Sequence, residues 1–213
     1  MKIITMIDNF KDIQELLEFG KDTYYYLQVI RRRKDPGNED QKEPERSMWC
    51  KFVCRPESLE RRREEIIGLC NYFNARAYIE LNPRSLEKFT ILCARKFLDR
   101  VYYHDYTNVF SVQSSIALSE DTISTRSILM KRRWMFDIDR PEDLQGIRDW
   151  ATKNEIVLRK TIPTPNGYHQ LIDAFNYTNL GISLGTDFTI KTEEGTEITT
   201  SVKPTSNTIL YCP

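Results

Sequence analysis

The sequence predicts an α+β fold in which a mixed, largely antiparallel sheet carries flanking helices. Short runs rich in β-branched and aromatic residues alternate along the chain with longer segments whose apolar residues recur at helical spacing. This alternation is typical of a layered domain, and 213 residues are enough to bury a sizeable core. We therefore expect one domain over residues 1–213, composed of an N-terminal α/β part (1–73) and a larger core part (74–213).

The N-terminal part is predicted to contain strands and helices in alternation. The expected elements are a strand at 1–7, a helix at 10–19 ended by Gly20, strands at 22–30 and 49–54, and a helix at 58–73 capped by Ser58. The strand at 22–30 contains Tyr24, Tyr25 and Tyr26, whose rings could stack on nucleic-acid bases. A tyrosine-rich strand more often packs one face against a core, so both interpretations stay open.

A charged segment, residues 31–47, interrupts this part of the chain. Its sequence, RRRKDPGNEDQKEPERS, combines charged residues with two prolines and one glycine, which indicates an exposed loop between two strands. Arg31, Arg32, Arg33 and Lys34 at its start could grip a phosphate backbone. The alternative is that this charge run is only a solvated face.

The core part is predicted to alternate in the same way. The expected elements are a strand at 76–81, a helix from Ser85 to about 103, a strand ending at 137–139, a helix after Pro141, and strands at 155–161, 168–174, 187–191 and 208–212. Residues 108–126 are rich in Ser and Thr and have no clear period. We expect them to form a loop that covers or lines a site.

Composition excludes some classes of protein. Lys plus Arg equal Asp plus Glu at 31 each, so the net charge of zero disfavours a general nucleic-acid coat while leaving room for a local basic groove. No apolar run approaches the roughly 18 residues of a membrane span, and the amino terminus has no signal-peptide pattern. We therefore expect a cytoplasmic protein without a membrane partner. The five cysteines have no regular spacing, and Cys50 and Cys54 lack the second pair of a zinc site.

Two aspartates close the most informative strand. Trp134, Met135, Phe136 and Ile138 form a short apolar run around Asp137 that ends before Asp139 and Pro141. Residues two apart in a strand point the same way, so Asp137 and Asp139 share a face and repel each other unless a cation lies between them. Their oxygens suit Mg²⁺ or Mn²⁺, ions that clamp the oxygens of a transferring phosphate. The alternative is a strand-end turn in which Asp139 caps the following helix.

A histidine follows some thirty residues later. Residues 163–167 have turn chemistry, and His169 lies at the start of the next apolar run. We expect its strand to lie beside the strand of the aspartates, where a histidine can bind phosphate or transfer a proton. The alternative is a half-buried polar residue without a role in chemistry.

The order Asp-x-Asp, then Asn166-Gly167-Tyr168-His169, resembles the archaeo-eukaryotic primase superfamily, which includes the primase-polymerases of phages and plasmids. Residues 74–84, NARAYIELNPR, are similar to the upstream strand and Asn-Pro-Arg-like turn of such proteins, so the resemblance covers about half of the chain. It implies an RRM-like primase catalytic core within residues 74–213 and template-directed nucleotidyl transfer. The implied partners are nucleoside triphosphates, a single-stranded DNA or RNA template and, where a helicase takes part, a separate protein.

The resemblance also assigns roles to residues. Asp137 and Asp139, with Asp187 as the third acid, would hold Mg²⁺ or Mn²⁺, and His169 would contact the nucleotide phosphates. Asp187 is favoured by its position in the order, whereas Asp173, Glu193, Glu194 and Glu197 are the other acidic candidates. The expected nucleotide- and nucleic-acid-binding residues are Lys131, Arg133, Arg159, Asn166, Gly167 and Arg84. Alternation along the strand means that only one of Arg159 and Lys160 faces the site.

Two other classes of function keep the same site. A phage- or plasmid-type binding module could hold a nucleotide or nucleic acid without turnover. A metal-dependent nuclease could use an aspartate pair and a histidine for phosphodiester hydrolysis. Analysis of the reaction products distinguishes all three.

Overall fold

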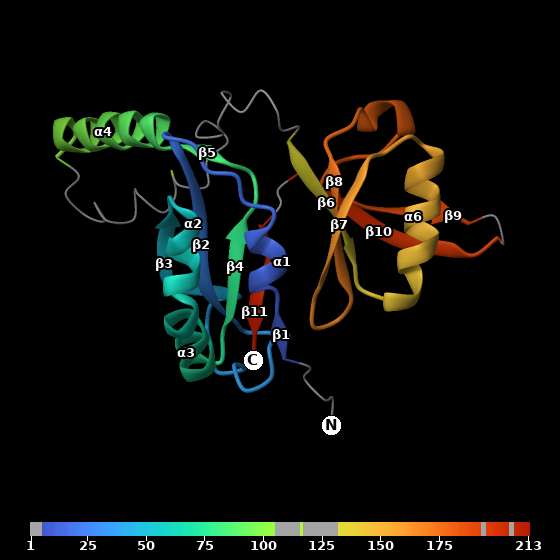
Figure 1. Ribbon diagram of the computed structural model, residues 1–213, viewed down its shortest axis with the longest axis horizontal. Helices are drawn as coiled ribbons and strands as arrows, with labels where there is room; N and C mark the ends of the chain where they lie inside the picture. The colour runs from blue at the N-terminus through green and yellow to red at the C-terminus, as the bar shows by residue number, and fades with distance from the viewer. Residues whose placement is uncertain (1–5, 105–115, 117–131, 193–194, 205–206) are drawn as a thin grey trace.

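The computed structural model describes residues 6–104, 116, 132–192, 195–204 and 207–213. It is an α+β fold with two antiparallel sheets that lie side by side (Figure 1). The strands are β1 (Ile7–Asp8), β2 (Thr23–Arg32), β3 (Glu45–Val53), β4 (Arg76–Glu80), β5 (Arg84–Ser85), β6 (Arg133–Ile138), β7 (Leu158–Pro163), β8 (Tyr168–Asp173), β9 (Asp187–Lys191), β10 (Glu197–Lys203) and β11 (Asn207–Cys212). The helices are α1 (Phe10–Gln14), α2 (Pro56–Arg61), α3 (Arg63–Phe73), α4 (Leu86–Tyr102) and α6 (Leu144–Lys153), with short 3₁₀ turns at Pro141–Asp143 and Tyr177–Leu180. The first sheet has α2 and α3 on one face and α4 on the other, and the second sheet has α6 on one face.

The first sheet has the strand order β1-β11-β4-β2-β3, with β5 paired to β2. Its central strand β2 is buried on both faces, because Tyr25 packs beneath the helices while Tyr24 and Tyr26 pack around Phe89 of α4. All three tyrosines are at most 2% exposed, so none is available to stack on a base. The packing interpretation of this strand is therefore confirmed.

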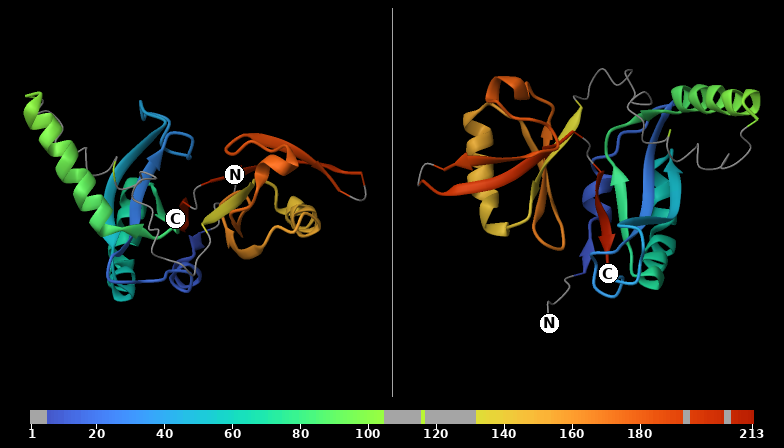
Figure 2. Two further views of the ribbon diagram at one scale, coloured as in Figure 1. Left: turned by 90° about the horizontal axis from the view of Figure 1, so that it is seen from above. Right: turned by 180° about the vertical axis from the view of Figure 1, so that it is seen from behind.

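The second sheet has the strand order β7-β8-β6-β10-β9. One face is covered by α6, whose Ile147 packs with Phe136, Ile172 and Val202 in a continuous core. The other face carries the alternate residues of β6 and turns toward the first sheet. Helix α1 lies between the two sheets (Figures 1 and 2), and its Phe10 and Ile13 share a core with Met135 and Leu171.

Buried hydrogen bonds join the two sheets. Asn82, which is 3% exposed, donates to the carbonyl of Arg133 over 2.9 Å and accepts from its backbone N–H over 2.8 Å. Asn9 donates both to the carbonyl of Pro163 in β7 and to that of Ile209 in β11. Because these amides satisfy buried backbone groups on both sides, separating the sheets would leave several of them unpaired.

Several expected elements differ in extent from those observed. The helix expected at 58–73 is divided at Arg62, and α2 begins at Pro56, whose fixed φ suits the first helical turn, instead of at a Ser58 cap. The helix expected at 10–19 is regular only over Phe10–Gln14. The predicted cap of α4 is confirmed, since the Ser85 hydroxyl accepts from the backbone N–H of Lys88.

The expected division at residues 73 and 74 does not separate the two sheets. β4 pairs with β2 in the middle of the first sheet, and β11 at the end of the chain pairs with β4. The second sheet is instead formed by residues 133–203, between α4 and β11. The expected loop at 108–126 lies outside the described residues, apart from Ile116. Within the described part of the chain, no helix is both long and apolar enough to cross a membrane.

Candidate functional site

The pairing of β6 with β8 brings the predicted aspartate and histidine together. The two strands are antiparallel, and Asp137 lies directly opposite His169. Residues that face each other across an antiparallel pair share one face of the sheet. This row continues through Ser201 of β10, which pairs with Asp137, to Asp187 of β9, which pairs with Ser201. The expected adjacency of the two strands is thus observed.

A hollow of about 220 Å³ lies where this row meets the first sheet. From the second sheet and its β7–β8 turn it is lined by Asp137, Asp139, His169, Thr164, Pro165 and Asn166, with Met135 at its base. From the first sheet it is lined by Arg32, Lys34, Glu45, Arg76, Tyr78, Asn207 and by Ile30 and Ile209. We call this hollow the junction pocket. The second sheet contributes Asp137 and Asp139, whereas the first sheet contributes Arg32, Lys34 and Arg76 together with Glu45.

The two aspartates sit at the open edge of the junction pocket. The Asp137 side chain is 37% exposed and Asp139 is exposed. Asp139 does not cap the following turn, whose N-cap residue is Arg140 and which receives no side-chain cap hydrogen bond. Among the described residues, the only basic side chain within ion-pair distance of Asp137 is His169, at 3.6 Å between Nε2 and Oδ1. The carboxylate pair therefore remains accessible to a cation from solvent.

His169 is held in one orientation by the first sheet. Its Nδ1 lies 2.8 Å from the hydroxyl of Thr208, a fully buried residue of β11, and its Nε2 faces Asp137. Burial lowers the pKa of His169; Asp137 and Asp139 oppose this shift, while the cations Arg32 and Lys203 add to it. The imidazole is therefore neutral at neutral pH. A fixed neutral imidazole can accept a proton or donate a hydrogen bond to a phosphate oxygen.

The turn between β7 and β8 packs tightly against the strand of the aspartates. Two hydrogen bonds between Thr164 and Gly167 close it, since the Thr164 N–H donates to the carbonyl of Gly167 and the Thr164 hydroxyl accepts from the N–H of Gly167. A Cβ placed on Gly167 would overlap the carbonyl oxygen of Ile138 and lie 3.0 Å from the carbonyl carbon of Asp139. Glycine thus permits the close approach that sets Asn166 beside Asp139.

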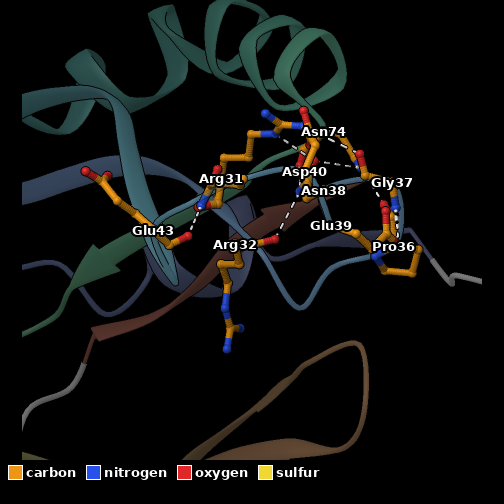
Figure 3. Close-up of polar contacts among 10 residues, drawn as sticks. Arg31, Arg32, Pro36, Gly37, Asn38, Glu39, Asp40, Glu43 and Asn74 are labelled. Carbon is orange, nitrogen blue, oxygen red and sulfur yellow. Dashed lines mark hydrogen bonds and ion pairs between the residues drawn. The ribbon is translucent and has the colours of Figure 1, made fainter.

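The basic side of the junction pocket comes from β2, β4 and the loop after β2. Arg32 donates to the Tyr78 hydroxyl over 2.9 Å and lies 3.3 Å from Glu45, and Figure 3 shows its guanidinium directed out of the loop toward the β7–β8 hairpin. Arg76 pairs with the buried Asp35. Burial alone lowers the pKa of Arg76, but Tyr78 and Asp35 raise it overall, so its charge is secure.

The charged segment at 31–47 is an ordered turn rather than a uniform solvated face. Asn38 is fully buried; it accepts from Arg31 Nε over 2.7 Å and donates to the carbonyls of Arg32 and Asn74 (Figure 3). Arg33 donates to the carbonyl of Lys42. Arg31 and Arg33 thus make contacts within the loop, whereas Arg32 at the end of β2 and Lys34 in the following turn line the junction pocket.

Other predicted site residues lie elsewhere. Arg133 shares the face of Asp137, but it is buried and its guanidinium donates to the carbonyls of Leu16 and Leu81. Arg159 forms a two-pronged ion pair with Asp173, both bonds 2.8 Å long. Neither arginine lines the junction pocket, nor does Arg84, which is buried in β5. Lys131 lies outside the described residues.

The third acid is aligned with the aspartate pair but separated from it. Asp187 is exposed at the start of β9, two strands from Asp137 in the shared row. Neighbouring strands are about 4.8 Å apart, so the two backbones are separated by roughly 10 Å. Across the described residues, no group of three or more His, Cys, Asp or Glu side chains is arranged to hold a metal ion.

The donor set nevertheless suits a hard divalent cation. Mg²⁺ commonly uses one or two carboxylates and completes its coordination with water and substrate phosphates instead of a full protein cage. Asp137 and Asp139 provide that number of carboxylates in an open position, beside cations that could receive the phosphates. The five cysteines are all free thiols.

Sequence reasoning missed several residues of the junction pocket. Arg76 and Tyr78 come from β4, and Thr208 orients His169 from β11, although both strands belong to the other sheet. Lys203 pairs with Met135 and lies on the face of the aspartates. The one available signal was the alternation of Arg76, Tyr78 and Glu80 on one side of a strand. It could not reveal which sheet that side would face.

No protein-family model, curated protein or solved structure matches this chain. The geometry of the junction pocket is therefore the evidence for the class of protein.

Proposed function

We propose that this protein catalyses metal-dependent nucleotidyl transfer of the primase or primase-polymerase type, making or extending strands on a nucleic-acid template. The observation that carries the proposal is the junction pocket, in which Asp137 and Asp139 face Arg32, Lys34 and Arg76 across a space that also contains His169. Transfer of a nucleotide from a triphosphate requires carboxylates that bind a divalent metal ion and, opposite them, basic side chains that bind the phosphates. The antiparallel second sheet with α6 on one face is compatible with an RRM-like primase core.

Each side chain has a distinct part in this proposal. Arg32, Lys34 and Arg76 bind the phosphates, and because Arg32 and Arg76 are already tied to Tyr78 and Asp35, little side-chain entropy is lost on binding. His169, fixed by Thr208, hydrogen-bonds a phosphate oxygen or moves a proton at Nε2. Asp137 and Asp139 would hold Mg²⁺ or Mn²⁺, which when bound stabilises charge on the reacting phosphate.

The test is an extension assay on single-stranded DNA, with and without a primer, containing all eight nucleotides and either Mg²⁺ or Mn²⁺. We expect Asp137→Asn and Asp139→Asn each to abolish extension. Asp149→Asn is the matched control, because Asp149 is an exposed aspartate on α6, whose helix covers the opposite face of the sheet. His169→Asn should reduce extension without unfolding the protein.

The products decide among the alternatives. Strand cleavage that depends on Asp137 would replace nucleotidyl transfer with nuclease activity. Nucleotide binding without any product would identify a binding module. Extension that survives in the Asp137→Asn and Asp139→Asn proteins would reject the site assignment.

A further inference from the structure

A second hollow of about 260 Å³ adjoins the junction pocket. The two share Lys34, Arg76, Pro165 and Asn166 in their linings. The remaining walls of the second hollow come from Asp35, Pro36, Ala75, Cys212 and Pro213, with the exposed Asn74 at the rim. We call it the side pocket. Away from Lys34, Asp35 and Arg76, its lining is more apolar than that of the junction pocket.

The walls of the side pocket are fixed in the absence of a ligand. The Asn74 amide donates to the carbonyl of Pro36 over 2.6 Å, and the buried Asn38 donates to the carbonyl of Asn74 over 2.8 Å (Figure 3). Asp35, next to Pro36, is held by its ion pair with Arg76. Gly37 and Asn74 both have positive φ values, which lets the loop turn onto the end of α3. The side pocket is thus preformed and suited to a rigid ligand.

Volume and chemistry indicate one ligand across both pockets. At about 220 and 260 Å³, each lies below the range of about 300–1,000 Å³ that is usual for small-molecule sites, whereas together they fall within it. With a divalent cation on Asp137 and Asp139, the side chains of Arg32, Lys34 and Arg76 suit a ligand that carries negative charge at one end. Its other end must be compact and flat, with apolar faces and edges that hydrogen-bond the amides of Asn74 and Asn166.

We propose that the two pockets form one nucleoside triphosphate site, with the base in the side pocket and the phosphates in the junction pocket. This inference rests on the proposed function, because it takes the junction pocket to bind phosphates. A base packed among Pro36, Ala75 and Pro165 contacts protein groups, so the nucleotide can bind before any template strand is present.

The test is calorimetric titration in Mg²⁺, without nucleic acid, of ATP, GTP, CTP, UTP and inorganic tripolyphosphate. Packing of a base contributes about 1–3 kcal/mol, so we expect the preferred nucleotide to bind at least about fivefold more tightly than tripolyphosphate. Pro36→Trp fills the side pocket from an exposed position and should remove this advantage while leaving tripolyphosphate binding unchanged. Pro44→Trp is the control, since Pro44 is exposed on the same loop but lines neither pocket.

Each outcome bears on a different proposal. If all four nucleotides bind no more tightly than tripolyphosphate, the side pocket is not a base site, although nucleotidyl transfer remains possible. If Pro36→Trp weakens tripolyphosphate as much as the nucleotides, the pocket assignment is also overturned. If neither tripolyphosphate nor any nucleotide binds, the proposed function itself fails.

Discussion

Gly167 is the position at which one added methyl group should most clearly push the β7–β8 turn away from β6. It lies in the β7–β8 turn, and a Cβ there would overlap the carbonyl oxygen of Ile138 and approach the carbonyl carbon of Asp139 to 3.0 Å. Both obstacles are backbone atoms, so no side-chain rotation relieves the clash. In Gly167→Ala the turn must therefore move away from β6, and Asn166 moves with it.

The cost can be estimated from the packing. Overpacking of a closed site usually costs about 1–3 kcal/mol. Because the added methyl group meets rigid backbone of Ile138 and Asp139, we expect a cost of about 3 kcal/mol. For a protein of this size the urea m-value is about 2–3 kcal/mol/M, so the unfolding midpoint should fall by roughly 1–1.5 M. Because Asn166 lines the junction pocket, nucleotide affinity should fall as well.

Urea unfolding followed by far-UV circular dichroism measures this effect. Gly68→Ala is the matched control, because Gly68 lies within α3 and a Cβ there meets nothing within 4 Å. Alanine is a better helix former than glycine, so this control should be neutral or stabilising by up to about 1 kcal/mol. A Gly167→Ala protein with the wild-type midpoint and wild-type nucleotide affinity would refute the close packing of turn and strand.

Three further predictions concern buried polar groups. Burial raises the pKa of Tyr25 to about 12, which favours the neutral phenol in the folded state. The free energy of unfolding is therefore unaffected below pH 10 and falls as the pH rises from 10 to 12. Urea unfolding across that range should show a fall about 1.4 kcal/mol per pH unit steeper in the wild type than in Tyr25→Phe. Asn82→Ala leaves the buried N–H and carbonyl of Arg133 unpaired and should lower the free energy of unfolding by about 2–4 kcal/mol; a loss under 1 kcal/mol would contradict the role given to this amide. Burial also raises the pKa of Cys70 to about 12 and raises the pKa of Cys212. At pH 8 both thiols should therefore react with iodoacetamide only after the protein unfolds. Rapid labelling of the native protein would count against the packing of these two cysteines.

Local sequence patterns were sufficient to predict most strands. The strand of the aspartates and β9, Asp187–Lys191, were located by β-branched and aromatic residues bounded by turn residues. Such features depend on neighbouring residues alone and can therefore be read without the fold. The expected adjacency of the strands that carry Asp137 and His169 is also observed, although α6 and β7 lie between these strands in the chain.

Long-range pairing could not be predicted in this way. Nothing within residues 74–84 shows that β4 joins β2 and β11 instead of the second sheet, so the basic side of the junction pocket was only partly anticipated. Arg133 illustrates the same limit. It lies on the face of Asp137, but its guanidinium is directed by the carbonyls of Leu16 and Leu81, which are 117 and 52 residues away in the sequence.

The position of β11 has a consequence for the order in which the protein can fold. This strand lies between β1 and β4, although it is made after the whole second sheet. During synthesis, which proceeds at about 5–20 residues per second, the position between β1 and β4 therefore stays unoccupied until the second sheet has been made and β11 follows it. When β11 pairs with β1 and β4, it also brings Thr208 to His169. The last strand to be made thus completes the first sheet and orients the histidine at the same time.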